Sequence, residues 1–215
     1  MTPTVLLAFL ALLVVLTLIH EAGHALAVRS RGGRILRIRL GRGIRVARSP
    51  QREDGPQWVL ALPPFGGRIT YEGIPEGTPQ AVVAVAGPAA NAVAAWLAFA
   101  LAGIMAPDPS VLPGAGELDS LTFASASMAA WFALVPAALV ELVAEGGVDE
   151  LRQALALLPQ VLSGGGLAGL LYVTGAGSAL WAVLNLVPVP VVGTDGWHVL
   201  RSLGAAVRSR REVSP

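Results

Sequence analysis

The sequence predicts a mainly α-helical, polytopic membrane protein with three core transmembrane helices, a small membrane-associated β element and an extra apolar segment. Of its 215 residues, 54% are hydrophobic and only 13% are charged. The apolar residues form long blocks rather than helix-period stripes, and one basic stretch separates the first two blocks. We expect residues 1–215 to form a single membrane-embedded domain.

The first core span is expected over about residues 4–28. Val5 to Ile19 contains no charged residue. A helix of about 25 residues that rises 1.5 Å per residue can cross about 30 Å of hydrocarbon. Met1 to Thr4 has no basic residue, and no convincing small-residue cleavage site precedes the histidines. We therefore expect a permanent span rather than a removed signal peptide.

The segment 29–79 is the only long polar stretch, with ten arginines against four acidic residues. Its apolar residues fall in short runs separated by glycine and proline, which predicts a β-rich region over 34–72. The four runs are Arg34–Leu40, Ile44–Val46, Trp58–Leu62 and Arg68–Tyr71. The arginines place this region on the cytoplasmic side. They lack interleaved stacking aromatics, so we expect contact with the lipid bilayer and no binding of nucleic acid.

Two further core spans are expected at about 80–106 and 166–190, and Pro188 and Pro190 must end the helix of the last one. Between them, residues 121–162 contain an apolar block and an amphipathic block within an acidic region. If every apolar block crossed the membrane once, the basic loop and the basic C-terminal segment would lie on opposite sides. We therefore expect 121–162 to be an interfacial or re-entrant segment, or to cross twice as a hairpin.

The segment His20-Glu21-Ala22-Gly23-His24 places ionisable groups at the end of an uncharged span. An ionisable group at bilayer depth costs roughly 2.5 to 3.5 kcal/mol. Because positions i and i+4 share a helix face, both imidazoles can bind one Zn²⁺, with Glu21 beside them as a general base. The alternative, that these are ordinary polar residues near the membrane interface, leaves three costly groups unexplained.

A catalytic zinc needs a third protein ligand and one open position. The chain has no cysteine, so His, Asp and Glu are the available ligands. Asp195 is the best-placed candidate, because it follows a proline-broken helix and can turn back into the bundle. Thr194 or Asp195 can also cap the helix that follows, and the two roles are compatible. His198 is expected to pack or to support the ligands, since a fourth ligand would close the site.

The chain resembles the site-2 protease family of intramembrane zinc metalloproteases. Three separated patterns carry the resemblance: His20-Glu21-Ala22-Gly23-His24, Gly87-Pro88-Ala89-Ala90-Asn91, and Asn185-Leu186-Val187-Pro188-Val189-Pro190 followed by Asp195-Gly196. Pro64-Phe65-Gly66-Gly67 also resembles the membrane-dipping β element of that family. The resemblance implies that His20, His24 and Asp195 bind one zinc ion per chain and that Glu21 is the general base. It also implies three core spans with the active site toward the cytoplasm.

The sequence departs from the family pattern in two places. The aspartate usually follows the asparagine of the last motif by eight residues, whereas Asn185 and Asp195 are ten apart. The PDZ domain that many members carry between the second and third core spans is missing from the corresponding stretch of this sequence.

Candidate substrate contacts come from the remaining motif residues. A helical substrate must be unwound before cleavage, and an edge strand within residues 63–71, including Gly66 and Gly67, could hold the extended segment. Asn185 could stabilise the oxyanion, which is commonly worth about 3 kcal/mol, or could satisfy carbonyls freed by the prolines. For Asn91, a structural hydrogen bond is the favoured interpretation over substrate binding.

The expected function is that of an intramembrane zinc endopeptidase, which hydrolyses peptide bonds in or near transmembrane segments. The expected substrate is a transmembrane protein or a leftover signal peptide, and the expected location is a bacterial-type plasma membrane. The alternative is a catalytically silent relative that acts as a scaffold or chaperone for membrane segments, but a binder has no need of Glu21. A transporter would spread ionisable residues over several spans and often show repeated halves. The sequence makes no prediction of oligomeric state.

Overall fold

The computed structural model describes residues 3–50, 55–63, 66–106, 108–116, 118–190 and 193–213. This part of the chain is mainly helical with one small sheet, which confirms the predicted fold class. The helices are α1 (Pro3–Ser30), α2 (Thr78–Met105), α3 (Ser120–Glu145), α4 (Asp149–Gly164), α5 (Gly166–Leu186) and α6 (Asp195–Val213), with a 3-10 turn η1 at Pro109–Val111. The strands are β1 (Arg34–Leu40), β2 (Ile44–Arg48), β3 (Gln57–Leu62) and β4 (Gly67–Glu72).

The chain divides into two compact units, Met1–Ala90 with Asn185–Pro215, and Asn91–Leu184. One boundary falls inside α2 and the other near the end of α5. The expected single metalloprotease domain over 1–215 stays a prediction.

Four helices in the described chain are long and apolar enough to span a membrane, one more than the three core spans predicted. The candidate spans are Leu10–Ser30, Thr78–Met105, Ser120–Glu145 and Gly166–Leu186. The additional one is α3, which has 26 residues and an 18-residue window with a mean hydropathy of 1.8. The last span ends at Leu186, earlier than the expected residue 190, because Val187 precedes a proline and is disfavoured in a helical conformation.

Residues 121–162, which the sequence left open as an interfacial segment or a hairpin, form the two helices α3 and α4. The Asp119 carboxylate caps α3 by accepting the N–H groups of Leu121 and Thr122. Gly146 ends α3 with a left-handed φ of 71°. Glu141 of α3 then accepts the N–H of Asp149 at 2.7 Å, which joins α3 to the start of α4. With 16 residues, α4 is shorter than a typical transmembrane helix.

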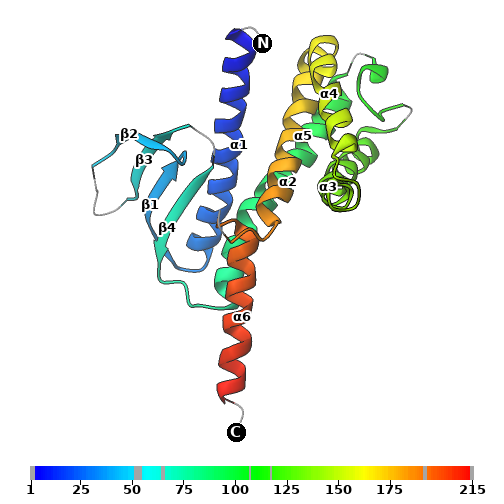
Figure 1. Cartoon of the computed structure of the whole chain (residues 1–215). Coiled ribbons are helices and arrows are strands. Elements are labelled where there is room, and N and C mark those ends of the chain that lie inside the picture. The colour runs from blue at the N-terminus through cyan, green and yellow to red at the C-terminus, as the bar shows by residue number, and fades with distance from the viewer. Residues whose placement is uncertain are drawn as a thin grey trace. The chain divides into compact units, whose positions relative to one another are not determined.

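The four strands form one sheet in the order β2-β3-β1-β4, close to the four predicted runs. β1 pairs in parallel with β3 and antiparallel with β4, while β2 is antiparallel to β3. Both β2 and β4 are edge strands. The sheet lies beside α1, which contacts β1 and β4 (Figure 1). Ile35 and Ile38 of β1 are buried in one cluster with Ala27 and Val28 of α1.

Close packing of α1 on the first half of α2 depends on Gly23. A β-carbon on Gly23 would lie 2.3 Å from the Ala86 carbonyl oxygen and 2.7 Å from the Ala90 β-carbon. Both distances are too short for any larger residue without movement of the helices. The absence of a side chain on Gly23 thus lets the α2 backbone approach α1 closely.

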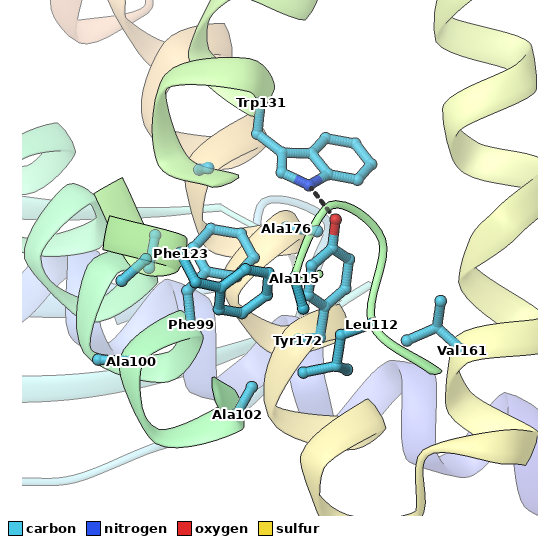
Figure 2. Close-up of a cluster of buried hydrophobic side chains, with 13 residues drawn as sticks. Phe99, Ala100, Ala102, Leu112, Ala115, Phe123, Trp131, Val161, Tyr172 and Ala176 are labelled. Carbon is cyan, nitrogen blue, oxygen red and sulfur yellow. Dashed lines mark hydrogen bonds between the residues drawn. The ribbon is translucent and has the colours of Figure 1, made fainter. Parts of the chain in front are cut away.

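The second unit has a conventional apolar core, which Figure 2 shows in close-up. Phe99 of α2, Phe123 of α3 and Tyr172 of α5 pack their rings together, with ring centroids 5.2 Å and 6.1 Å from that of Tyr172. The Trp131 indole N–H donates to the Tyr172 hydroxyl at 3.3 Å, so the two polar groups of this aromatic core satisfy one another (Figure 2).

Candidate metal centre

Two histidines of α1 and the first residue of α6 converge on one point inside the first unit. His20 Nε2 lies 2.9 Å from Asp195 Oδ2, and His24 Nε2 lies 3.3 Å from Asp195 Oδ1. The two Nε2 atoms are 3.2 Å apart. One ligand atom from each side chain lies within 4.8 Å of the other two, so the three can reach a single ion.

The hydrogen bond made by His24 Nδ1 shows which nitrogen of this ring is available to a metal. His24 Nδ1–H donates to the Val83 carbonyl oxygen of α2 at 2.7 Å. In the neutral ring this leaves the lone pair on Nε2, directed at a second imidazole nitrogen and a carboxylate oxygen. Without a metal, protons on the imidazoles can satisfy these contacts, and a cation bound by the same three side chains would replace those protons. Two imidazoles and one carboxylate are also a common donor set for catalytic zinc, so the residues fit the ion.

Gly87 of α2 keeps the space next to these donors open. A β-carbon at this position would lie 2.4 Å from His24 Nε2 and 2.8 Å from His20 Nε2. Any other residue would push against the two imidazole nitrogens of the candidate donor group. The motif Gly87-Pro88-Ala89-Ala90-Asn91 therefore places its glycine at the candidate metal centre.

Glu21 is buried beside the convergence point, with 4% of its surface exposed. A β-carbon on Gly67, the first residue of β4, would lie 2.4 Å from Glu21 Oε1. The other carboxylate oxygen, Oε2, is buried and has no hydrogen-bond partner among the described residues. A buried carboxylate with one free oxygen can exchange a proton with a molecule bound at the site.

The loop before α6 brings Asp195 to the histidines despite the long spacing from Asn185. The Thr194 hydroxyl donates to the Val187 carbonyl oxygen at 2.6 Å and accepts the Val189 N–H at 3.0 Å. These bonds tie the start of α6 to the end of α5 and leave the Asp195 side chain available to the imidazoles. Residues 191 and 192 of this loop lie outside the described residues.

The environment of Asp195 favours its charged form. Burial by itself raises the pKa of this carboxyl group, but hydrogen bonds and positive charge from His20 and His24 outweigh burial and hold the pKa at about 2. A carboxylate that is ionised at neutral pH is the form that binds a metal.

Other residues singled out in the sequence lie at or near this unit without joining the three donors. His198 is half-buried, and its pKa is lowered by burial; it does not belong to the donor group found in the described chain. Gly66 has a left-handed φ of 69°, and a β-carbon there would lie 2.7 Å from Arg42 Nε. Asn185 is half-buried and interacts with other residues. Pro64 and Phe65 lie outside the described residues.

Asn91 belongs to the second unit and is fully buried. Its backbone carbonyl accepts a hydrogen bond from the Ser178 hydroxyl at 2.8 Å. Both polar atoms of its side chain lack a partner among the described residues. The favoured hydrogen-bonding role for this side chain stays a prediction.

Sequence reasoning missed the contribution of Val83 and Gly87. They are four residues apart on α2, so they share a helix face. The Val83 carbonyl faces Nδ1 of the His24 ring, and Gly87 faces Nε2, the candidate metal ligand. The glycine was visible in the sequence, but a backbone carbonyl carries no sequence signal.

Comparison with known proteins covers nearly the whole chain. The sequence model of Peptidase family M50, the site-2 protease family, matches residues 8–214. The chain is 31% identical over 140 residues to Protease RseP of Yersinia pestis, an alignment that covers 56% of this chain and 30% of the relative. The chain thus matches less than a third of that protein's length.

Proposed function

The chain belongs to Peptidase family M50, and from this premise we propose that it is an intramembrane zinc endopeptidase that cleaves transmembrane segments. Family membership supports a protease, and the apolar helices support a multi-pass integral membrane protein. The observation that carries the finer proposal is the convergence of His20, His24 and Asp195 with the buried carboxylate of Glu21 beside them.

In this proposal His20 and His24 provide two neutral imidazole ligands and Asp195 the third. A bound zinc ion would supply Lewis-acid chemistry that polarises a peptide carbonyl and makes water nucleophilic near neutral pH. Val83 holds the His24 ring in the tautomer that leaves Nε2 free to bind. Gly87 keeps the neighbouring space open for a small molecule.

Glu21 acts as the general base and then as the general acid. Its carboxylate takes a proton from the attacking water and returns it to the leaving amine as the peptide bond breaks. Proton transfer of this kind typically contributes about 10² to 10⁴ in rate. The unpartnered Oε2 supports the assignment, since this oxygen has no competing hydrogen bond among the described residues.

The position of β4 supports a way to hold the substrate. β4 is an edge strand, and its first residue, Gly67, contacts the Glu21 carboxylate. A substrate segment unwound from its helix can pair with the free edge of β4, which would lead its backbone toward Glu21. Gly66 and Gly67 are then substrate contacts through their backbone groups, and Asn185 and Asn91 stay candidates for substrate or oxyanion contact.

The membrane orientation follows from the charged loop. We propose that the sheet and the metal centre lie toward the cytoplasm of a bacterial-type plasma membrane, because ten arginines in residues 29–79 favour that side. A transmembrane protein or a leftover signal peptide is the proposed substrate.

Replacement of Glu21 by alanine tests the proposal. Purified wild-type protein in detergent is expected to hold one zinc ion and to cleave a model transmembrane substrate. Glu21→Ala should retain the zinc and lose at least a hundredfold in cleavage rate, because only proton transfer is removed. Zinc content by mass spectrometry and cleavage on gels give the two readouts.

The alternative function, a silent scaffold or chaperone, makes a different prediction in the same experiment. A scaffold would bind the substrate equally well as wild type and as Glu21→Ala, and neither form would cleave it. Equal cleavage by both forms would instead contradict the role of Glu21.

A further inference from the structure

The sheet has two chemically different faces, as its register shows. Residues paired across strands point to the same face, and neighbours along a strand alternate. Ile38 pairs with Ile69 and with Trp58, so all three share one face, which is apolar. Arg39 pairs with Arg68 and with Val59 on the opposite face.

The opposite face, here called the arginine face, carries five arginines that form no ion pair within the described chain. They are Arg37, Arg39, Arg45, Arg48 and Arg68. Arg39 instead donates to the carbonyl oxygens of Gly41, Arg42 and Gly43, and Arg37 donates to Gln57. The carboxylate that the described strands place on this face, that of Glu72, lies 3.8 Å from Arg34. Five like charges on adjacent strands make this face strongly positive, so it attracts anions.

Only half of the apolar face is covered. The half on β1 and β4 packs on α1 and α2 through Ile35, Ile38 and neighbouring side chains. The half on β2 and β3 leaves four large apolar side chains exposed, here called the apolar patch. They are Ile44 (81% exposed), Trp58 (46%), Leu60 (41%) and Leu62 (50%). Exposed apolar groups in such a contiguous set indicate a contact surface.

We propose that the β2 edge of the sheet binds anionic phospholipids, with the phosphates on the arginine face and the acyl chains against the apolar patch. β2 is an edge strand that carries Arg45 and Arg48 on one face and Ile44 on the other. One lipid can reach both faces by wrapping this edge. The inference does not depend on protease activity.

Two observations favour a lipid over other anionic partners. The sheet packs on Ala27 and Val28, near the end of the candidate span Leu10–Ser30, so its apolar patch is held close to the bilayer. A nucleic acid would satisfy the arginines but would leave the four apolar side chains in water. A lipid satisfies both, since arginines near an anionic surface contribute favourably while acyl chains cover the patch.

Lipids brominated on their acyl chains test this, because bromine quenches nearby tryptophan fluorescence. The full chain is reconstituted in vesicles that contain brominated phosphatidylglycerol or brominated phosphatidylcholine at the same mole fraction. The contribution of Trp58 is the difference between wild type and Trp58→Phe. Quenching by the anionic lipid is expected to be several-fold stronger, and the preference should weaken in high salt.

Removal of two arginines should abolish the preference. Arg45→Gln/Arg48→Gln is expected to make the two lipids quench Trp58 equally, whereas Arg208→Gln on α6 should leave the preference unchanged. Circular dichroism and zinc content check that the variants remain folded.

If a protein or RNA, rather than an anionic lipid, binds this surface, the fluorescence experiment gives a different result. Equal quenching by both lipids in wild type overturns the proposal, as does the absence of quenching by either lipid, which would indicate that a second copy of the chain or another protein covers the patch. Arginine-dependent binding of RNA without a lipid preference also overturns it.

Discussion

The two units of this molecule bury polar groups in opposite ways. In the second unit, the polar groups of the aromatic core are paired, as in the Trp131 indole N–H donated to the Tyr172 hydroxyl. In the first unit, His20, His24 and Asp195 bring one possible metal-ligand atom each to within 4.8 Å of the other two. His20 Nδ1 and Glu21 Oε2 also lack partners within the described chain.

This difference teaches how to separate a structural polar group from a functional one. A buried polar pair that is complete can be explained by stability alone, because each partner removes the desolvation penalty of the other. A buried cluster whose atoms can also ligate a metal is instead a candidate for binding. Asn91 shows the limit of the comparison, since its side chain is unpartnered although it belongs to the second unit.

The strongest test of the comparison is the loss of a donor from the first unit. Asp195→Ala should lower zinc affinity by more than a hundredfold, since the binding free energy of a structural zinc site, about 10 to 16 kcal/mol, divides into roughly 3 kcal/mol or more per ligand. Zinc titration against a competing chelator measures this change. Zinc retained as tightly as in wild type would show that Asp195 is not a ligand.

A smaller effect is expected when the space beside the donors is filled. Gly87→Ala places a methyl group where the built β-carbon lies 2.4 Å from His24 Nε2. We expect a loss of about 10- to 100-fold in zinc affinity or cleavage, similar to that of other changes around metal ligands. The same titration and cleavage assays measure it.

Gly204→Ala on α6 is the matched control for that change. A β-carbon on Gly204 meets no atom within 4 Å, so this substitution should only raise helix propensity, by up to about 1 kcal/mol. If both alanine variants behave alike, Gly87 has no special place at the metal centre.

The smallest effect belongs to the second unit. Tyr172→Phe removes the acceptor of the Trp131 N–H and should cost about 1 kcal/mol in unfolding free energy. Thermal unfolding in detergent detects this loss. Zinc content should remain that of wild type, and a changed zinc content would contradict the division between a structural core and a metal-binding unit.

Local patterns explain why much of the fold was predictable. The uncharged run before His20 predicted a long helix, and the four short apolar runs between residues 34 and 72 predicted the strands to within one or two residues. The structure of residues 121–162 was harder to predict. Asp119 caps α3 and Glu141 caps α4 by accepting backbone N–H groups, and which N–H group each carboxylate reaches depends on the path of the turn. The mainly apolar helix α3, with 26 residues, is a candidate span in addition to the three that were expected.

The candidate site was predictable where it depends on one helix and hidden where it depends on several. The spacing of His20 and His24 put both rings on one face, since an α-helix repeats every 3.6 residues. The proline-broken end of α5 indicated that Asp195 could return to them. Nothing in the sequence placed Gly67 against Glu21, because that contact depends on the register of β4 with β1.

Composition and local periodicity predicted the chemical types of the candidate site, two imidazoles and two carboxylates in an apolar chain, and the helices and strands that carry them. The packed structure was needed to show that Val83 orients His24 and that Gly87 keeps the space beside the donors open. It was also needed to show that no described residue covers half of the sheet's apolar face. The physical reason is the separation along the chain of the residues that interact. Helix and strand periodicity acts between residues a few positions apart, whereas these contacts join segments that are distant in the chain, and their geometry exists only once the helices and the sheet have packed.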